Sequence, residues 1–189
     1  MVRRSIILIA LIAAACGFSP VVVQLIPRYE APRSEIGVGK TVLLEVRDAR
    51  ADPEVGRRQH GLLPGSRIEL AAPIETTVRD ALASALRRQR FTVVTEGTAA
   101  TRLSIEVVEL QYHPNGAPVG PRITTSASIR AVATSAGGRY SRVYSRADQD
   151  AQVIGTSGHF NGARLSALLS DTFRQLIADE ALIAILAAD

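Results

Sequence analysis

The sequence has no tryptophan, and it has only four phenylalanines and four tyrosines among its 189 residues. Sites that bind sugars or single-stranded nucleic acids by stacking depend on aromatic side chains, so this composition argues against such a site. Hydrophobic residues still make up 47% of the chain and charged residues 21%, which are ordinary values for a globular protein. We therefore expect a core of leucine, isoleucine, valine and alanine.

A large excess of positive charge is also missing. The net charge is +4, and two of the positive charges, Arg3 and Arg4, lie near the first residue. Without them, 20 basic and 18 acidic residues remain, and the arginines are scattered along the chain. Mixed charges of this kind are typical of an ordinary solvated surface. The sequence therefore predicts no nucleic-acid partner.

Residues that commonly hold metals are few. The three histidines, His60, His113 and His159, have no second histidine, cysteine or carboxylate at ligand spacing. Asp148 and Asp150 stand two residues apart, but they lack the further ligands of a calcium loop. We therefore predict no metal site.

Motifs for nucleotides and for nucleophilic catalysis are incomplete or absent. Residues 37–41 (GVGKT) resemble a phosphate loop, but the earlier glycine of that motif is missing and a predicted strand follows instead of a helix. No G-x-S-x-G motif occurs. Asp48 and Asp52 are expected to cap a turn and to pair with Arg47 or Arg50. The sequence thus predicts no cofactor, no nucleotide and no enzymatic activity.

The chain has a single cysteine, Cys16, at an informative place. Two arginines precede the apolar run 6–15, and that run ends in three alanines directly before Cys16. Ten apolar residues are too few to span a bilayer, which needs about 20 in a helix. They match the hydrophobic part of a secretory signal, and small residues suit its cleavage site. A plain signal peptide with an incidental cysteine is the alternative.

The segment 12–16 (IAAAC) resembles the lipobox of bacterial lipoproteins, in which the cysteine is acylated and the leader is removed. Ala13 replaces the usual leucine. The resemblance implies a signal peptide at residues 1–15 and lipid attachment at Cys16. Gly17 follows instead of aspartate, and by analogy with enterobacterial sorting this favours the outer membrane.

Prolines and glycines are frequent between residues 17 and 39, so residues 16–39 are predicted to form the lipidated cysteine and a flexible tether, with a short extended piece at 21–23. A single α+β domain is expected at 40–189. Alternating or β-branched patterns predict strands near 40–46, 67–70, 91–94, 103–112, 123–134 and 139–147, with a loop at 53–66.

The last two strands of this series, joined by Gly137-Gly138, are typical of an antiparallel hairpin. Apolar residues at helical spacing predict a helix at 74–89 and another beginning near Leu165, and Asp179 is expected to restart a short helix. We expect an antiparallel sheet of about four to five strands packed by two main helices. The stripe containing Leu169 and Phe173 is predicted to be core and not a membrane-binding face.

The order of these pieces resembles the YajG-like family of bacterial lipoproteins. The most specific matching segments are Val42–Arg50 (VLLEVRDAR) and Leu168–Leu186 (LLSDTFRQLIADEALIAIL). The match runs over nearly the whole chain but is mostly an apolar pattern elsewhere. The resemblance implies a lipoprotein anchored through Cys16 to the periplasmic face of the bacterial outer membrane, and it transfers no catalytic residue.

One surface stands out as a candidate for a protein partner in the envelope. Tyr140, Arg142, Tyr144 and Arg146 alternate along one predicted strand and therefore share a face. Tyrosine and arginine are enriched where proteins bind one another, although a solvated strand with arginines over tyrosine rings gives the same pattern.

Together these features predict a non-enzymatic binding or scaffolding lipoprotein of the envelope. An accessory lipoprotein of a lipid or lipopolysaccharide transport system is the alternative, and it requires an apolar groove or cavity. A hydrolase of the envelope is a further alternative, and it requires a cleft that joins His113 or His159 to a carboxylate.

Overall fold

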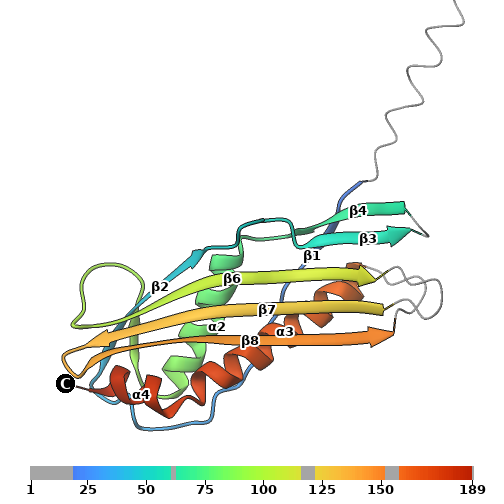
Figure 1. The fold of residues 1–189 in the computed structure, drawn as a ribbon. Coiled ribbons are helices and arrows are strands. Elements are labelled where there is room, and N and C mark those ends of the chain that lie inside the picture. Colours follow the sequence, from blue (N-terminus) through green and yellow to red (C-terminus); the bar gives the residue numbers. More distant parts are fainter. Residues whose placement is uncertain (1–18, 61–62, 116–121, 152–157, 189) are drawn as a thin grey trace, which may run out of the picture.

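The computed structural model describes residues 19–60, 63–115, 122–151 and 158–188. Eight of its elements form one sheet, and Figure 1 shows their arrangement. In chain order the elements are β1 (Val21–Val23), β2 (Thr41–Asp48), β3 (Gly56–His60), β4 (Leu63–Leu70), α2 (Ile74–Arg88), β5 (Thr92–Val94), β6 (Thr101–Asn115), β7 (Arg122–Ser135), β8 (Gly138–Ala151), α3 (Gly158–Ile177) and α4 (Glu180–Ala187).

The long strand β6 organises the sheet. One edge of β6 pairs with β7 in antiparallel fashion, and β7 pairs with β8 in the predicted hairpin. The other edge is shared, because β2 runs parallel to its first half and β3 meets it at Tyr112. Beyond these strands, β5 pairs with β2, and β4 and β1 continue from β3.

The sheet therefore differs from the prediction in two respects. It has eight strands instead of four to five, and it is mixed, since the pairs β1–β4, β2–β5, β2–β6 and β3–β6 are parallel. The predicted loop at 53–66 also contains β3 and the start of β4. Glycine, proline and arginine in these two strands hide the alternation that normally marks a strand.

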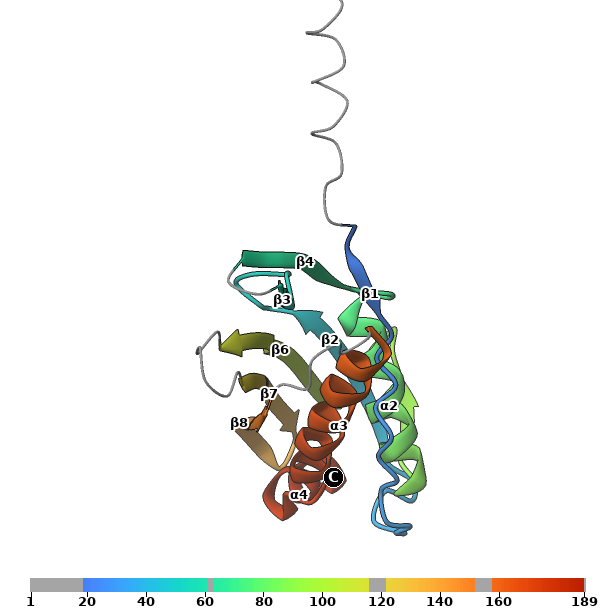
Figure 2. The ribbon, with the colours of Figure 1, turned by 90° about the vertical axis from the view of Figure 1, so that its right-hand side faces the viewer.

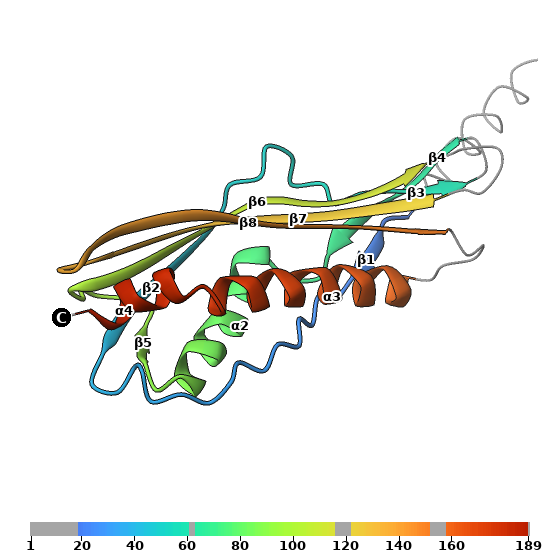
Figure 3. The same ribbon diagram turned by 60° about the horizontal axis from the view of Figure 1, so that its bottom comes forward.

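The three helices of the described residues, α2, α3 and α4, lie on one face of the sheet (Figure 3). Buried side chains from α2, α3 and α4 meet those of the sheet in one core. The stripe on α3 is part of that core, as predicted, and Leu165, Leu169 and Phe173 are at most 1% exposed. Helix α4 begins after Asp179, again as predicted. Within the described residues, no helix has the length and apolar character needed to cross a bilayer.

The opposite face of the sheet carries paired charges. Glu106 accepts hydrogen bonds from Arg47 and, over 2.8 Å, from Arg130. Arg102 lies 3.1 Å from a carboxylate oxygen of Glu45 on the neighbouring strand. Cross-strand pairs of opposite charge are common on a sheet face that is exposed to solvent.

Residues 19–39 pack along the domain and are not a free tether there. The predicted extended piece at 21–23 is strand β1, which pairs with β4. Val23 and Ala31 are 1% and 0% exposed, and exposure alternates from Val21 to Ala31 as in an extended chain. We call residues 19–39 the strap; it lies between α2 and α3 in Figure 2. The folded domain thus begins earlier than residue 40.

Candidate functional site

Three of the four side chains predicted as a partner surface converge on Asp179. The hydroxyls of Tyr140 and Tyr144 donate hydrogen bonds of 2.9 and 2.7 Å to its Oδ2, and Nη1 of Arg142 donates a third of 2.9 Å. The other oxygen, Oδ1, accepts from the backbone N–H groups of Ala181 and Leu182 and so caps α4. One carboxylate therefore joins β8 to the start of α4.

Burial and hydrogen bonding act in opposite directions on this carboxylate. The Asp179 side chain is only 5% exposed, and burial alone raises the pKa of a carboxyl group. The hydrogen bonds from Tyr144, Tyr140, the Leu182 N–H and Arg142 outweigh burial and hold the pKa of Asp179 below its usual value. Burial, followed by the hydrogen bond to Asp179, raises the pKa of the Tyr144 hydroxyl. The cluster is thus an ionised carboxylate held by two tyrosine hydroxyls, backbone N–H groups and one arginine.

This geometry corrects the picture of an open partner surface. Tyr144 is 3% exposed, so its ring is not available to a partner, whereas Tyr140 is partly exposed and packs against the core. The alternation along β8 correctly placed the side chains on one face. That face points toward the start of α4, where Asp179, more than thirty residues later in the chain, accepts the hydrogen bonds. Arg146 lies outside the cluster and is exposed.

A second arrangement, which the sequence analysis missed, fixes the strap to α3. The hydroxyl oxygens of Ser166 and Ser170 accept hydrogen bonds of 2.9 Å from the N–H groups of Ile26 and Arg28. Residues four apart on a helix are about 6.0 Å apart along its axis, and residues two apart on an extended chain about 6.6 Å. The two serines therefore match alternate N–H groups of the strap.

Gly162 continues this row one turn earlier on α3. A Cβ atom at Gly162 would lie only 2.8 Å from the carbonyl oxygen of Gln24, so a side chain there would push the strap away. One turn after the serines, the guanidinium of Arg174 lies 5.9 Å from the ring centre of Tyr29. The signal in the sequence is the four-residue spacing of Gly162, Ser166 and Ser170.

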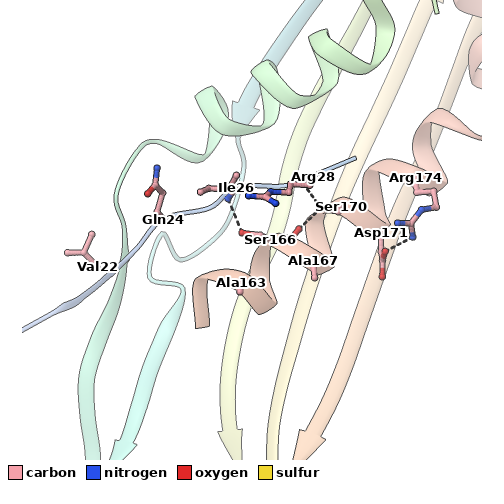
Figure 4. Close-up of a pocket in the computed structure, with 10 residues that line it drawn as sticks. All are labelled: Val22, Gln24, Ile26, Arg28, Ala163, Ser166, Ala167, Ser170, Asp171 and Arg174. Atoms are coloured by element: carbon pink, nitrogen blue, oxygen red, sulfur yellow. Dashed lines mark hydrogen bonds and ion pairs between the residues drawn. The ribbon is translucent and has the colours of Figure 1, made fainter. Parts of the chain in front are cut away.

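A groove of about 720 Å³ lies between the strap and α3 (Figure 4). We call it the strap groove. Its apolar part includes Val22 and Ile26, which are 59% and 51% exposed, and its charged part includes Arg28 and Arg174. The lining residues are Val22, Gln24, Ile26, Arg28, Ala163, Ser166, Ala167, Ser170, Asp171 and Arg174.

Of the three histidines, only the side chain of His113 lies among those that the structure describes, and the side chains of His60, His159 and Asp150 lie outside them. The ring of His113 is exposed and its Nε2 lies 2.6 Å from the side-chain oxygen of Gln111. No group of three potential metal ligands occurs among the described residues. A strand, β2, follows residues 37–41, as the sequence predicted.

The VRDAR segment has a structural role in this fold. Arg50 donates two hydrogen bonds of 2.8 Å to the carboxylate of Asp48, and the Arg50 side chain is only 6% exposed. These bonds, against the effect of burial, hold the pKa of Asp48 below its usual value. The N–H of Ala49 donates to the carbonyl of Val107 on β6. The predicted pairing of Asp48 with an arginine is confirmed, and it fixes the chain as it leaves β2.

Cys16, the predicted site of lipid attachment, lies outside the described residues. In sequence it stands five residues before Val21, the first residue of β1.

Solved structures with a similar fold come from several bacteria. A crystal structure of a protein from Xanthomonas campestris has a TM-score of 0.58 at 16% identity, covering 86% of this chain and 95% of that one. A minor lipoprotein from Acinetobacter baumannii gives 0.40 at 12% identity, with 78% and 92% of the two chains covered. Lipoprotein GNA1162 from Neisseria meningitidis gives 0.36 at 14% identity, with 72% and 97% covered.

Among curated proteins, no similar sequence is found. A family model described as "Uncharacterized lipoprotein" matches residues 27–187. The resemblance to YajG-like lipoproteins is thereby confirmed. Since the match covers most of the chain, this protein belongs to that family of uncharacterised bacterial lipoproteins.

Proposed function

We propose that the protein is anchored by acyl chains on Cys16 to the periplasmic face of the outer membrane, where it acts as a non-enzymatic binding or scaffolding module. The leader at residues 1–15 and the position of the lone cysteine support the anchor. Two acyl chains already hold a protein stably on a bilayer, so the lipoprotein would remain membrane-bound.

The observation that carries this proposal is the short path from Cys16 to the folded domain. Five residues span at most about 18 Å when fully extended, and the strap is packed from β1 onward. The anchor would therefore hold the domain, and the strap groove with it, beside the membrane surface. A lipoprotein on a long free linker would instead sample a wide volume.

The side chains of the strap groove suit binding better than catalysis. The apolar groups of Val22, Ile26 and Ala167 are exposed beside arginines. Apolar surface with a few polar groups at one end is the common character of binding clefts. The carboxylate of Asp171 within this groove is paired with Arg174, which leaves it poorly placed as a catalytic base.

The same groove favours one second candidate, an accessory lipoprotein of a lipid or lipopolysaccharide transport system. An acyl chain would lie along Val22 and Ile26, and an anionic headgroup would be close to Arg28 and Arg174. The space between sheet and helices is filled by core side chains, so on this proposal the lipid would lie in the surface groove.

The anchor is tested with Cys16→Ser in the full chain. We expect the wild-type protein in the outer-membrane fraction of a sucrose gradient, with an acylated N-terminal cysteine by mass spectrometry. The variant should remain as an unprocessed precursor or become soluble. A processed Cys16→Ser protein that still floats with the outer membrane would exclude lipid anchoring at this residue.

The groove is tested with a photo-crosslinking amino acid at Ala167, with Ser84 on α2 as the matched control, since both positions are exposed on helices. Binding of a protein partner predicts a discrete crosslinked band in the envelope at Ala167 only. Crosslinking to lipid instead, detected by mass spectrometry, would support the transport candidate. Equal crosslinking at both positions would contradict a specific role of the groove.

A further inference from the structure

Strand β8 has one unpaired edge. It pairs with β7 from Ser135↔Gly138 to Arg122↔Ala151, and within the described ranges no other strand pairs with it. In Figures 1 and 2 it is the outermost strand on its side of the sheet. Between Ser141 and Gln149, every residue except Tyr144 is exposed. Alternate residues of this fourteen-residue strand therefore direct their backbone N–H and C=O groups away from β7, along one edge.

This edge lacks most of the features that normally prevent strands from pairing. Such features are proline, a bulge, a very short strand, a covering segment and charged side chains, and of these β8 has only the charges. β8 has no proline, its register with β7 is unbroken, and glycine occurs only at its first residue. Between positions 141 and 147 the side chains on its outer face, Ser141, Val143, Ser145 and Ala147, are small and uncharged. An edge of this kind readily accepts another strand.

The charges on the other face of β8 are arranged asymmetrically. Arg142 and Arg146 precede Asp148 on the same face. Arg142 is already held by Asp179. In the part of the chain that the structure describes, Arg146 and Asp148 take part in no ion pair, and both are exposed. Arg146 and Asp148 are thus a positive and a negative charge outside any such ion pair, with only Ala147 between them.

We propose that β8 pairs antiparallel with β8 of a second copy of this chain, about a two-fold axis through Ala147. In that register Arg146 of each copy stands opposite Asp148 of the other. Directly opposite side chains on antiparallel strands have Cβ atoms about 4.5–5.5 Å apart, within reach of an ion pair. Two Arg146–Asp148 ion pairs therefore form, one on each side of the axis. Both copies use the same surface, as two-fold symmetry requires.

Other arrangements of the two strands satisfy the charges less well. A parallel in-register pair would place Arg146 beside Arg146 and Asp148 beside Asp148. Shifting the antiparallel axis by one residue, to Arg146, would put the two Arg146 side chains opposite each other. Shifting it to Ser145 would place Asp148 against Arg142, which Asp179 already holds.

The space beside this edge supports the same arrangement. A groove of about 610 Å³ lies between β8 and α3, and Arg146, Ala147 and Asp148 form its β8 side. On the α3 side, Ala163, Ala167 and Leu168 contribute apolar surface, and Arg164 and Asp171 contribute charged groups. The face of a second strand that carries its own Arg146 and Asp148 would project into this groove. This groove meets the strap groove at Ala163, Ala167 and Asp171 on α3. The proposal itself concerns the β8 edge and goes beyond the binding role proposed above.

The test uses Ala147→Cys in the full-length chain in intact envelopes. Position 147 faces itself across the axis, so mild oxidation should give a disulfide-linked dimer of twice the mass of the chain. Ser141→Cys, also exposed on β8, should give none, because that residue lies far from the axis. The wild-type chain, whose single cysteine is Cys16, is the control. A dimer of the wild-type chain would show that Cys16 is not acylated, and would contradict the proposed anchor and not the proposed pairing of β8.

Charge reversal then tests the register in the Ala147→Cys background. Arg146→Asp and Asp148→Arg each place like charges opposite one another, so each should reduce the dimer band several-fold. The double variant, and co-expression of the two single variants, restore opposite charges and should restore the band. Unchanged protease resistance confirms that each variant is folded.

Three outcomes would overturn the proposal. The first is a folded Ala147→Cys protein that forms no dimer. The second is a dimer band insensitive to both charge reversals. The third is crosslinking of Ala147→Cys to a chain of different mass, which would make the edge a site for another protein.

Discussion

A single carboxylate at Asp179 receives five hydrogen bonds. The donors and the acceptor are not equivalent in such a cluster. Removing one tyrosine hydroxyl leaves the carboxylate with four donors. Removing the carboxylate takes the acceptor from two tyrosine hydroxyls and two backbone N–H groups, while Arg142, whose side chain is 59% exposed, can bind water. Unsatisfied buried groups cost about 1–3 kcal/mol each, so the acceptor is the sensitive position.

We therefore expect Asp179→Ala to lower the free energy of unfolding by about 3–5 kcal/mol. Loss of the helix cap contributes about 1 kcal/mol, and the unpaired hydroxyls contribute most of the rest. Urea unfolding followed by circular dichroism measures the change. Tyr140→Phe is the matched control, because it removes one donor and keeps the acceptor, and it should cost much less. Equal effects of the two substitutions would contradict the central role of Asp179.

The lowered pKa of Asp179 makes its contribution depend on pH. In an unfolded chain the pKa of aspartate is about 3.9, and in the folded protein it is lower. The stabilisation is therefore complete above pH 4 or so and is lost as the pH falls through the folded-state pKa. The stability difference between wild type and Asp179→Asn should shrink on acidification below about pH 4. A constant difference down to acid unfolding would contradict this assignment, since the other carboxylates are common to both proteins.

Substitution of Gly162 by alanine should have opposite effects on the stability of α3 and on the packing of the strap. Glycine to alanine within a helix normally stabilises it by about 0.5–1 kcal/mol. Here the new Cβ would lie 2.8 Å from the carbonyl oxygen of Gln24, so Gly162→Ala should instead loosen the strap. Trypsin should then cut at Arg28 several-fold faster than in wild type. Ser84→Ala, at an exposed position on α2, is the control. Faster cleavage at Arg28 in this variant as well would indicate a general loss of stability.

At the scale of elements, the sequence predicted best where pattern and turn agreed. Gly137-Gly138 between two alternating segments identified the β7–β8 hairpin, because both signals are local. The parallel pairing of β2 with β6 has no such local signal, since it joins segments more than fifty residues apart. Leu63–Leu70 carries proline and glycine inside a strand, and these residues normally indicate a loop.

Prediction of the candidate sites was limited in the same way, because their contacts join segments that are far apart in the sequence. The alternation of Tyr140, Arg142 and Tyr144 correctly placed them on one face, but their common acceptor lies more than thirty residues later. The strap was predicted as a tether because Pro20, Pro27 and Pro32 are typical of linkers. Its order comes from serine hydroxyls on α3, which accept from its N–H groups where a sheet partner is missing.

The strap should therefore be required for full stability. A fragment of residues 40–189 lacks β1 and the buried Val23 and Ala31. Burial of one valine is worth about 1.5–3 kcal/mol, and each lost backbone hydrogen bond adds about 1 kcal/mol. The urea midpoint of this fragment should lie clearly below that of residues 19–189. Matching midpoints would show that the strap only rests on the surface.

The whole molecule has two different ends. In Figures 1 and 3, the chain enters at β1, while the β7–β8 turn lies at the other end of the long strands. Fourteen residues of β7 correspond to a length of about 46 Å. A path of at most about 18 Å from Cys16 to β1 is much shorter than this. An acylated Cys16 would therefore bring the β1 end, but not the turn, close to the bilayer.

This arrangement gives a direct prediction for the anchored protein. Acylation leaves no free thiol on Cys16, so a new cysteine in place of Val22 or Thr134, both exposed, can be labelled alone with a fluorophore. In phospholipid vesicles containing a headgroup spin label, quenching should be several-fold stronger at position 22, because collisional quenching needs contact at the bilayer surface. The unlipidated Cys16→Ser protein should show no difference between the two positions. Equal quenching at both positions of the anchored protein would mean that the domain lies flat on the membrane, and stronger quenching at Thr134 would reverse the orientation derived from the strap.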